Sequence, residues 1–183
     1  MDCMIEIQLA TGNERKLREA RAACDDFGIT VNQLKIEIDE IQHHESLEIS
    51  KDKAAKAFKL SGRPVVITDT SWSIAALNGF PGGYMKDVAG WFSAEDFINL
   101  VDKDRRISFT ETIIYKDSKQ EKIFSQEYLG VIAETPRGTG NSIERVAEFG
   151  GFTIGERHDQ GGFSHDPKDY VWYQFAKWYS KNV

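Results

Sequence analysis

VVITDTSWSIAALNGFPGGYMK, residues 65–86, is the stretch that decides the fold and the chemistry expected of this chain. Its β-branched start follows a proline and precedes polar residues, which predicts a short buried strand. That strand would carry Asp69 to its end, where ligands bind in open α/β sheets. The run 78–83, with three glycines and a proline, predicts a sharp loop shortly before Lys86. An acid facing a constrained loop and a cation suits chemistry on phosphate with a metal ion; the alternative is a strand-capping acid and an ordinary turn.

The composition is that of a soluble globular domain. Of the 183 residues, 40% are hydrophobic and 28% are charged, enough for a sizeable core. The net charge of −6 argues against binding to nucleic acid, which requires a cationic surface. Cys3 and Cys24 are too few for a disulfide framework and lack metal-ligand spacing, which favours a reducing compartment. Since no basic leader or long apolar segment is present, we expect a cytoplasmic protein that does not enter a membrane.

The order of the expected elements predicts an α/β fold. Strands and helices alternate in the first part of the chain, over 4–9, 13–27, 31–38, 46–60, 65–67 and 93–101. This βαβαβ order predicts a partly parallel sheet covered by helices. Two long strand-like runs, 106–115 and 122–133, flank a turn and predict an antiparallel hairpin. The remaining elements are a short helix at 141–149, a short strand at 152–154 and an aromatic helix at 168–181.

We expect one domain with two lobes that share a long mixed β-sheet flanked by helices. The core lobe would comprise about residues 1–105 and the C-terminal helix, and the second lobe about residues 106–165. No internal repeat, low-complexity tract or long linker separates the two.

The turn between the first strand and its helix is a candidate phosphate site. Gly12 lies at a helix start, where free N–H groups and the helix dipole favour an anion. Thr11 and Asn13 could add side-chain donors, and Lys16 lies one turn into the helix. The alternative is that Asn13 only caps the helix and Lys16 is a surface charge.

Acids and lysines further along the chain could complete such a site. Glu40 belongs to an acidic run after the second strand, and Mg²⁺ bound with phosphates takes one or two protein carboxylates. Glu40 and Asp69 are therefore candidate metal ligands, unless the acidic run is simply solvated. Lys53 lies in a Lys/Ala-rich helix of which only one or two lysines need face a ligand.

The loop GGFSHDP, residues 161–167, is a candidate base-binding segment. Phe163 or His165 could stack on a flat ring, and Asp166 could accept a hydrogen bond from a base or a sugar. Ser164 lies between them and is included among the candidate contacts. The alternative is an aromatic loop that serves packing alone.

The order of these motifs resembles that of the inosine triphosphate pyrophosphatase (Ham1-type) family. The matching segments are T-G-N-x-x-K at 11–16, Glu40 and Gln42, E-I-S-x-x-K at 48–53, the strand and loop at 69–86, P-R-G at 136–138 and G-F-x-x-D-P at 162–167. The resemblance implies a two-lobed, usually dimeric α/β protein. It also implies Mg²⁺-dependent hydrolysis of ITP, dITP and XTP to the monophosphate and pyrophosphate.

Specific roles follow from the motifs and the resemblance together. Asp69 would activate the attacking water, and Lys16, Lys53 and Lys86 would stabilise the departing pyrophosphate. Thr70, which follows Asp69 in the matched strand, would contact the nucleotide. The nucleotide is expected between the lobes, with its phosphates over the turn at 11–16.

The chain departs from the family pattern at three places. Thr68 stands where relatives usually carry an acid, and residues 139–160 form an insertion. The late Lys and the Ser-His-Arg triplet that hold the base in the family are missing after Pro167. Arg157 and His158 could replace those donors. Otherwise the enzyme would have another base specificity, or the protein would bind nucleotides without catalysis.

Overall fold

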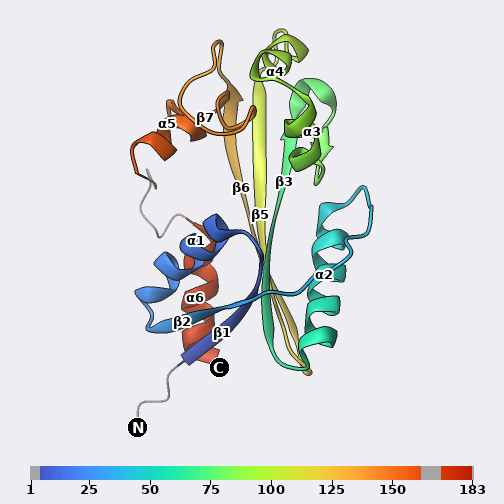
Figure 1. Cartoon of the computed structure of the whole chain (residues 1–183), viewed down its shortest axis with the longest axis vertical. Helices are drawn as coiled ribbons and strands as arrows, with labels where there is room; N and C mark the ends of the chain where they lie inside the picture. Colours follow the sequence, from blue (N-terminus) through green and yellow to red (C-terminus); the bar gives the residue numbers. More distant parts are fainter. Residues whose placement is uncertain (1–4, 162–169, 183) are drawn as a thin grey trace. The chain divides into compact units, whose positions relative to one another are not determined.

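The fold is built on one eight-stranded sheet (Figure 1). Its strand order is β2-β1-β3-β5-β6-β7-β8, and β4 pairs with β3. The computed structural model describes residues 5–161 and 170–182. The elements are β1 (Ile5–Ala10), α1 (Glu14–Asp25), β2 (Ile29–Leu34), α2 (Ser46–Ser61), β3 (Val65–Ile74), the 3-10 turn η1 (Ala75–Leu77), β4 (Pro81–Gly82), α3 (Met85–Trp91), α4 (Ala94–Leu100), β5 (Arg106–Lys116), β6 (Glu121–Ile132), β7 (Ala147–Phe149), β8 (Phe152–Thr153), α5 (Ile154–Asp159) and α6 (Val171–Asn182).

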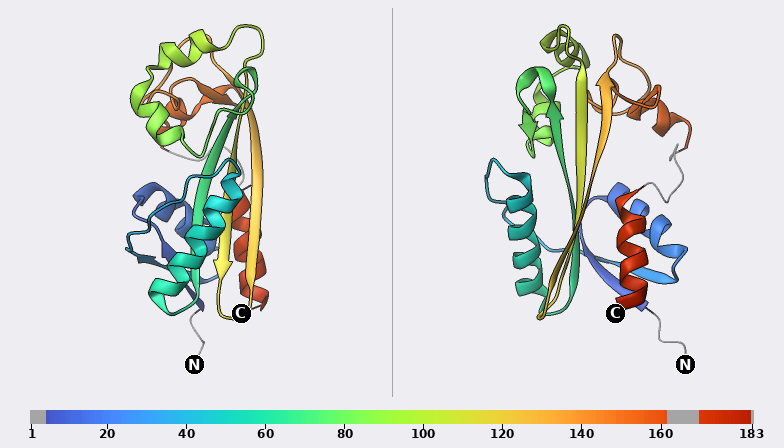
Figure 2. Two further views of the ribbon diagram at one scale, coloured as in Figure 1. Left: turned by 90° about the vertical axis from the view of Figure 1, so that its right-hand side faces the viewer. Right: turned by 180° about the vertical axis from the view of Figure 1, so that it is seen from behind.

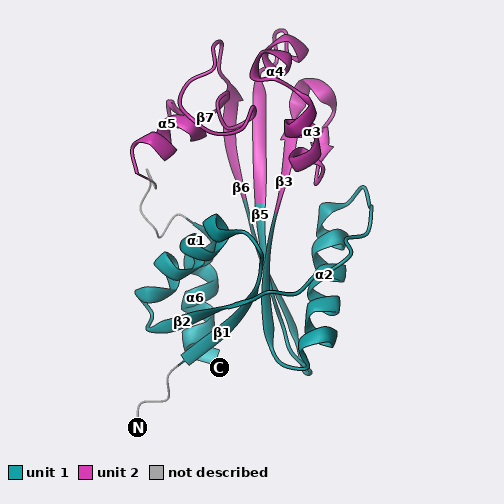
Figure 3. Ribbon diagram, in the orientation of Figure 1, with its two compact units in different colours: residues 1–69, 111–126, 166–183 teal, residues 70–110, 127–165 magenta. Residues whose placement is uncertain are grey.

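The chain divides into two compact units (Figure 3). Unit 1 comprises residues 1–69, 111–126 and 166–183, and unit 2 comprises residues 70–110 and 127–165. Strands β3, β5 and β6 therefore each contribute residues to both units. The lobe boundary expected near residue 105 stays a prediction about domain organisation.

Unit 1 contains the parallel part of the sheet. β1 pairs in parallel with β2 from Ile5–Ile29 onward, and with β3 at Leu9–Val66. The parallel arrangement predicted from the βαβαβ order is thus confirmed, as is the mixed α/β fold class. Within this unit α1 and α6 cover one face of the sheet and α2 covers the other (Figures 1 and 2).

Local sequence signals fix the ends of the first two helices. Asn13 caps α1, because its side-chain oxygen accepts hydrogen bonds from the backbone N–H groups of Arg15 and Lys16. Gly62 ends α2 in a left-handed conformation at φ 66°, as glycine allows without steric penalty. α1 ends at Asp25, two residues before the predicted end.

One correction concerns the strand that carries Asp69. β3 runs from Val65 to Ile74, so Asp69 lies in its middle and not at its end. The strand continues past its apolar start because β4 pairs with it at Trp72 and Ser73. The sharp loop predicted at 78–83 is confirmed, since it folds back to form that pairing.

Further corrections concern short elements. The strand predicted at 31–38 ends at Leu34, and the helix α3 was not predicted. The segment 141–149 is not a helix: a turn at 142–146 leads into β7. The backbone of residues 147–149 pairs with β6 instead, Ile132 opposite Ala147, so it joins the sheet and not a helix.

The second half of the chain otherwise follows expectation. β5 and β6 form the predicted hairpin around the turn at 117–120, where Asp117 accepts hydrogen bonds from two backbone N–H groups. Residues 139–160, expected to be an insertion, contain β7, β8 and α5 within unit 2. The core of that unit gathers the apolar residues Ile74, Phe97, Ile107, Ile143 and Val146.

The aromatic helix α6, expected at 168–181, packs into the core of unit 1. Phe175 is 0% exposed and lies against Trp172, Tyr179 and Phe124, with ring centroids 5.5 to 5.7 Å apart. Aromatic pairs at such distances stabilise beyond the area that they bury.

Replacing Phe175 by alanine should therefore destabilise the fold by about 3–5 kcal/mol, because it leaves a cavity among fixed rings. The free energy of unfolding in urea measures this loss. Lys177→Ala, at an exposed position of the same helix, should change it by less than about 0.5 kcal/mol. Equal effects of the two substitutions would contradict the packing described for α6.

Candidate functional site

The turn between β1 and α1 is held by its own side chains. The Thr11 hydroxyl accepts a hydrogen bond from the Asn13 N–H at 3.1 Å, and the Asn13 side-chain oxygen caps α1. The cap engages the oxygen of Asn13 and not its amide nitrogen, so the amide donors do not take part in it. Gly12 is exposed and its φ is not left-handed, and a Cβ placed there would meet no atom within 4 Å.

Lys16 reaches from α1 across to β3. Its Nζ donates to the backbone oxygen of Thr68 at 3.2 Å and lies 3.8 Å from Oδ1 of Asp69. β1 ends at Ala10 and pairs with β3 at Val66, so the Thr68 carbonyl lies beyond the end of the neighbouring strand. The ammonium group takes the place of a strand partner there.

Both members of this ion pair are largely withdrawn from solvent. The side chain of Lys16 is 14% exposed and that of Asp69 is 24% exposed. Burial lowers the pKa of Lys16, and the Asp69 carboxylate opposes that shift. The Lys53 ammonium lowers the same pKa and the Glu111 carboxylate raises it, so these charges act on one another in unit 1.

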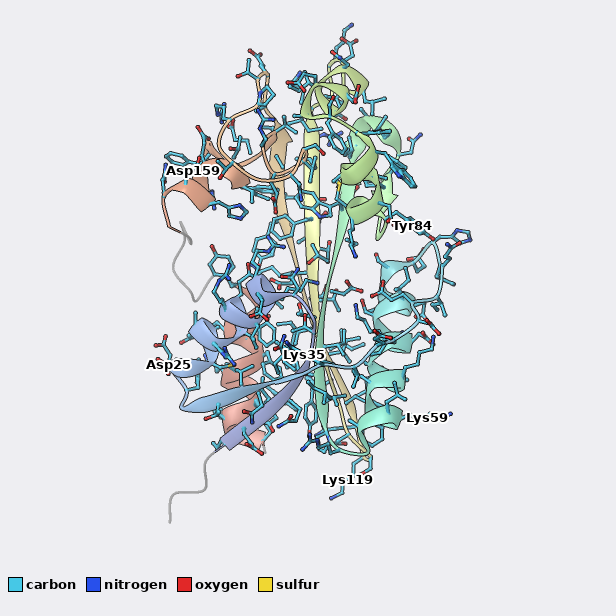
Figure 4. The ribbon with its side chains drawn as sticks, in the orientation of Figure 1. Asp25, Lys35, Lys59, Tyr84, Lys119 and Asp159 are labelled. Atoms are coloured by element: carbon cyan, nitrogen blue, oxygen red, sulfur yellow. The ribbon has the colours of Figure 1, made fainter. Side chains whose placement is uncertain are left out.

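A second ion pair joins α2 to the segment that precedes it. Lys53 Nζ donates to Glu40 Oε1 at 2.5 Å, and Lys56 donates to the backbone oxygen of Asp39 at 2.7 Å. Lys59, on the same helix, points away from the protein (Figure 4). Two lysines of the Lys/Ala-rich helix thus hold the acidic run. Glu40 keeps 53% of its side chain exposed.

Sequence reasoning missed one residue of this cluster. Glu111 on β5 is 8% exposed, and its Oε1 accepts a hydrogen bond from the Thr68 hydroxyl at 3.3 Å. Burial and then the Glu19 carboxylate raise the pKa of Glu111 to about 7, against opposing effects of Lys16, the Thr68 hydroxyl and Arg15. The only sequence signal was an acid at an inward-facing position of a strand that is otherwise apolar on that face.

Two sequence-predicted substrate contacts belong to unit 2. Thr70 is half-buried on β3, directly after Asp69, and Lys86 is exposed in the first turn of α3. Tyr84, which precedes that helix, is exposed as well (Figure 4). The role expected of Thr70 and Lys86 at the phosphates stays a prediction.

The base-binding candidates lie mostly outside the described residues. Phe163, Ser164, His165 and Asp166 all fall in the segment 162–169.

Arg157 and His158, the suggested replacements for the missing base-binding triplet, lie on α5. Arg157 donates to the backbone oxygen of Phe149, so it anchors α5 to the end of β7, whereas His158 is exposed. These observations do not test the role suggested for the two residues at the base, which stays a prediction.

Residues 5–161 and 170–182 contain no group of three or more His, Cys, Asp or Glu side chains arranged to hold a metal ion. Within these same ranges no helix combines the length and the apolar character that crossing a bilayer requires.

Comparison with known proteins places this chain in a family. The family model described as the Ham1 family matches residues 7–142. A dITP/XTP pyrophosphatase of Methanosarcina mazei is 34% identical over 161 residues, which cover 86% of this chain and 88% of the relative. Inosine triphosphate pyrophosphatase 2 of Trypanosoma cruzi is 32% identical over 162 residues, or 85% of this chain and 82% of the relative. The solved structure of a HAM1 protein from Coxiella burnetii has a TM-score of 0.77 and 25% identity, and the match covers 97% of this chain and 100% of that one. The chain therefore belongs to the Ham1 family.

Proposed function

We propose that this protein hydrolyses non-canonical purine nucleoside triphosphates, ITP, dITP and XTP, to the monophosphate and pyrophosphate with the help of Mg²⁺. The observation that carries the proposal is the ion pair of Lys16 and Asp69, 3.8 Å apart beside the start of α1. A cation largely shielded from solvent, next to a helix N-terminus, suits a phosphate chain, and an acid beside it suits the water that attacks the phosphate. The names of the two relatives support the choice of substrates.

In the proposed reaction a water oxygen attacks the α-phosphorus, and the bond from that phosphorus to the oxygen bridging to the β-phosphorus breaks. Asp69 accepts the proton of the attacking water. Lys16 stabilises the charge that develops on the departing pyrophosphate, and Lys53 and Lys86 are proposed to assist it. The turn Thr11-Gly12-Asn13 offers its N–H groups to the phosphates.

The residues present fit a magnesium ion. Mg²⁺ prefers oxygen ligands and, with a bound triphosphate, uses only one or two protein carboxylates. Glu40 presents an exposed carboxylate, and Asp69 is proposed as the second ligand. When bound, the ion would neutralise phosphate charge and polarise the α-phosphorus. Lys53, which now donates to Glu40, would then turn to a phosphate oxygen.

The cellular setting is proposed on the same grounds. The net charge of −6 and the cysteine usage support a cytoplasmic protein that does not bind nucleic acid. The family resemblance supports a homodimer. The base-binding role is assigned to Phe163, Ser164, His165 and Asp166.

A second candidate is the same hydrolysis with another base preference. The observation that favours it is in the sequence, since the family's late Lys and Ser-His-Arg triplet are missing after Pro167. The base would then meet a different set of donors than in the relatives.

Incubation with Mg²⁺ and a panel of nucleoside triphosphates tests both candidates. The panel should contain ITP, dITP, XTP, the four standard ribonucleotides and modified pyrimidines, and the products measured should be monophosphate and pyrophosphate. We expect the highest kcat/KM for ITP, dITP and XTP. A preference for another base would favour the second candidate, and no hydrolysis with any member would contradict enzymatic function.

Replacing Asp69 by asparagine should lower kcat at least about a hundredfold, because the amide cannot accept the proton of the attacking water. Binding of the nucleotide, measured by calorimetry, should persist. The matched control is Asp25→Asn at the exposed end of α1, where Asp25 points away from the protein (Figure 4). Near-normal turnover of the Asp69→Asn variant would remove Asp69 from the mechanism.

Replacing Gly12 by alanine tests phosphate binding at the turn without disturbing the fold. Since a Cβ at Gly12 meets no protein atom within 4 Å, the substitution should change stability by less than about 0.5 kcal/mol. A phosphate close to this backbone would meet the new methyl group, so KM should rise roughly tenfold, or about 1.4 kcal/mol. Gly90→Ala, in α3 and equally open, should leave KM unchanged. An unchanged KM for Gly12→Ala would show that the phosphates do not bind close to this turn.

A further inference from the structure

Glu111 is the only charged residue among the buried residues in the described part of the chain. It lies on β5, two residues before Ile113, which packs in the core cluster beneath α1 and α6. Side chains two apart on a strand share one face, so the carboxyl group of Glu111 faces inward on the side of α1. An apolar residue at this position would pack there without the desolvation of a carboxyl group. The presence of an acid therefore calls for a role beyond packing.

The groups that face Glu111 come from two elements, β3 and α1. The Thr68 hydroxyl of β3 donates to it at 3.3 Å, and Lys16, Glu19 and Arg15 of α1 act on it through their charges. Thr68 is bound through both its side chain and its main chain. Its hydroxyl is bound by Glu111, and its backbone oxygen accepts from Lys16.

Two acids act on the Lys16 ammonium in this arrangement. Asp69 Oδ1 lies 3.8 Å from Nζ, and the charge of Glu111, on the neighbouring strand β5, raises the pKa of the same group. A buried ammonium without counter-charges tends to lose its proton, and then it could not stabilise a departing phosphate group.

We propose that Glu111 is a positioning residue for the pyrophosphohydrolase reaction: its carboxylate fixes Thr68, and with it the backbone oxygen that aims Lys16, and supplies a second counter-charge for the Lys16 ammonium. The inference rests on the proposed function and extends it to a residue that does not itself contact the substrate. Its effect should appear in kcat more than in KM, because it acts through the orientation and charge of Lys16.

Kinetics of Glu111→Gln test this role, because glutamine keeps the shape and an acceptor oxygen but removes the charge. At pH 8 we expect kcat to fall by about ten- to a hundredfold, with KM for the preferred triphosphate changed less than about threefold. Because the pKa of Glu111 is raised to about 7, the difference in kcat between the wild type and Glu111→Gln should shrink toward pH 6. The kcat of the wild type should thus rise from pH 6 to pH 8 relative to that of Glu111→Gln. Glu111→Asp, which keeps the charge, should retain part of this rise.

Two further variants make the test specific. Thr68→Val removes the hydroxyl that Glu111 binds, and its effect on kcat should not add to that of Glu111→Gln, since both act through the same contact. The matched control is Glu127→Gln, since Glu127 also accepts a hydrogen bond from a hydroxyl, that of Ser108, at 2.7 Å, but is exposed. Its kcat should equal that of the wild type at every pH.

A stability scan shows whether Glu111 titrates as a buried group, independently of activity. The pKa of Glu111 is raised in the folded state, so its contribution to stability is full below the unfolded pKa and is lost as pH rises through about 7. The Tm of the wild type should therefore fall relative to that of Glu111→Gln between pH 5 and pH 8. A constant difference would contradict a buried, titrating carboxyl group.

The outcomes separate the two proposals. Wild-type kcat in Glu111→Gln at pH 8, or an equal loss at every pH, overturns the role of Glu111 while the proposed function stands. Absence of hydrolysis by the wild type across the whole nucleotide panel overturns both.

Discussion

The structure depends on one constraint: an ammonium group is held out of solvent where β1 stops short of β3. Past the Leu9–Val66 pair, the backbone oxygen of Thr68 receives the Lys16 Nζ, 3.2 Å away. A cation so placed needs counter-charge, and Asp69 and Glu111 supply it from neighbouring strands. The same group can serve folding and chemistry, because a phosphate chain presents the kind of oxygen acceptor that Thr68 presents here.

Local signals in the sequence were enough for most of the fold. The Asn13 cap, the Gly62 stop and the alternation of strands with helices are short-range features, and the structure has all three. The length of β3 was missed because its second half depends on pairing with β4, a partner that lies beyond a loop. The segment 141–149 was misjudged for a similar reason, since pairing with β6 overrides a local helical tendency.

The candidate site was only partly accessible to sequence reasoning. Lys16 and Asp69 were expected to share a site, and the structure has them 3.8 Å apart. Glu111 could not be singled out, because an acid within a strand is usually a solvated residue and its burial becomes visible only from the packing of α1. Thr68, expected to remove an acid from the site, turns out to bind one from the next strand. The residue that departs from the family pattern is thus a hydrogen-bond partner of the buried carboxyl group.

A crystal structure with Mg²⁺ and a non-hydrolysable analogue of dITP, bridged by nitrogen or carbon between the α- and β-phosphorus atoms, tests the central claim most directly. The account predicts phosphate oxygens within hydrogen-bond distance of Lys16 Nζ and of the N–H groups at the start of α1, with the Asp69 carboxylate facing the α-phosphorus. A triphosphate bound away from this turn, with Lys16 still directed at the Thr68 carbonyl, would contradict it.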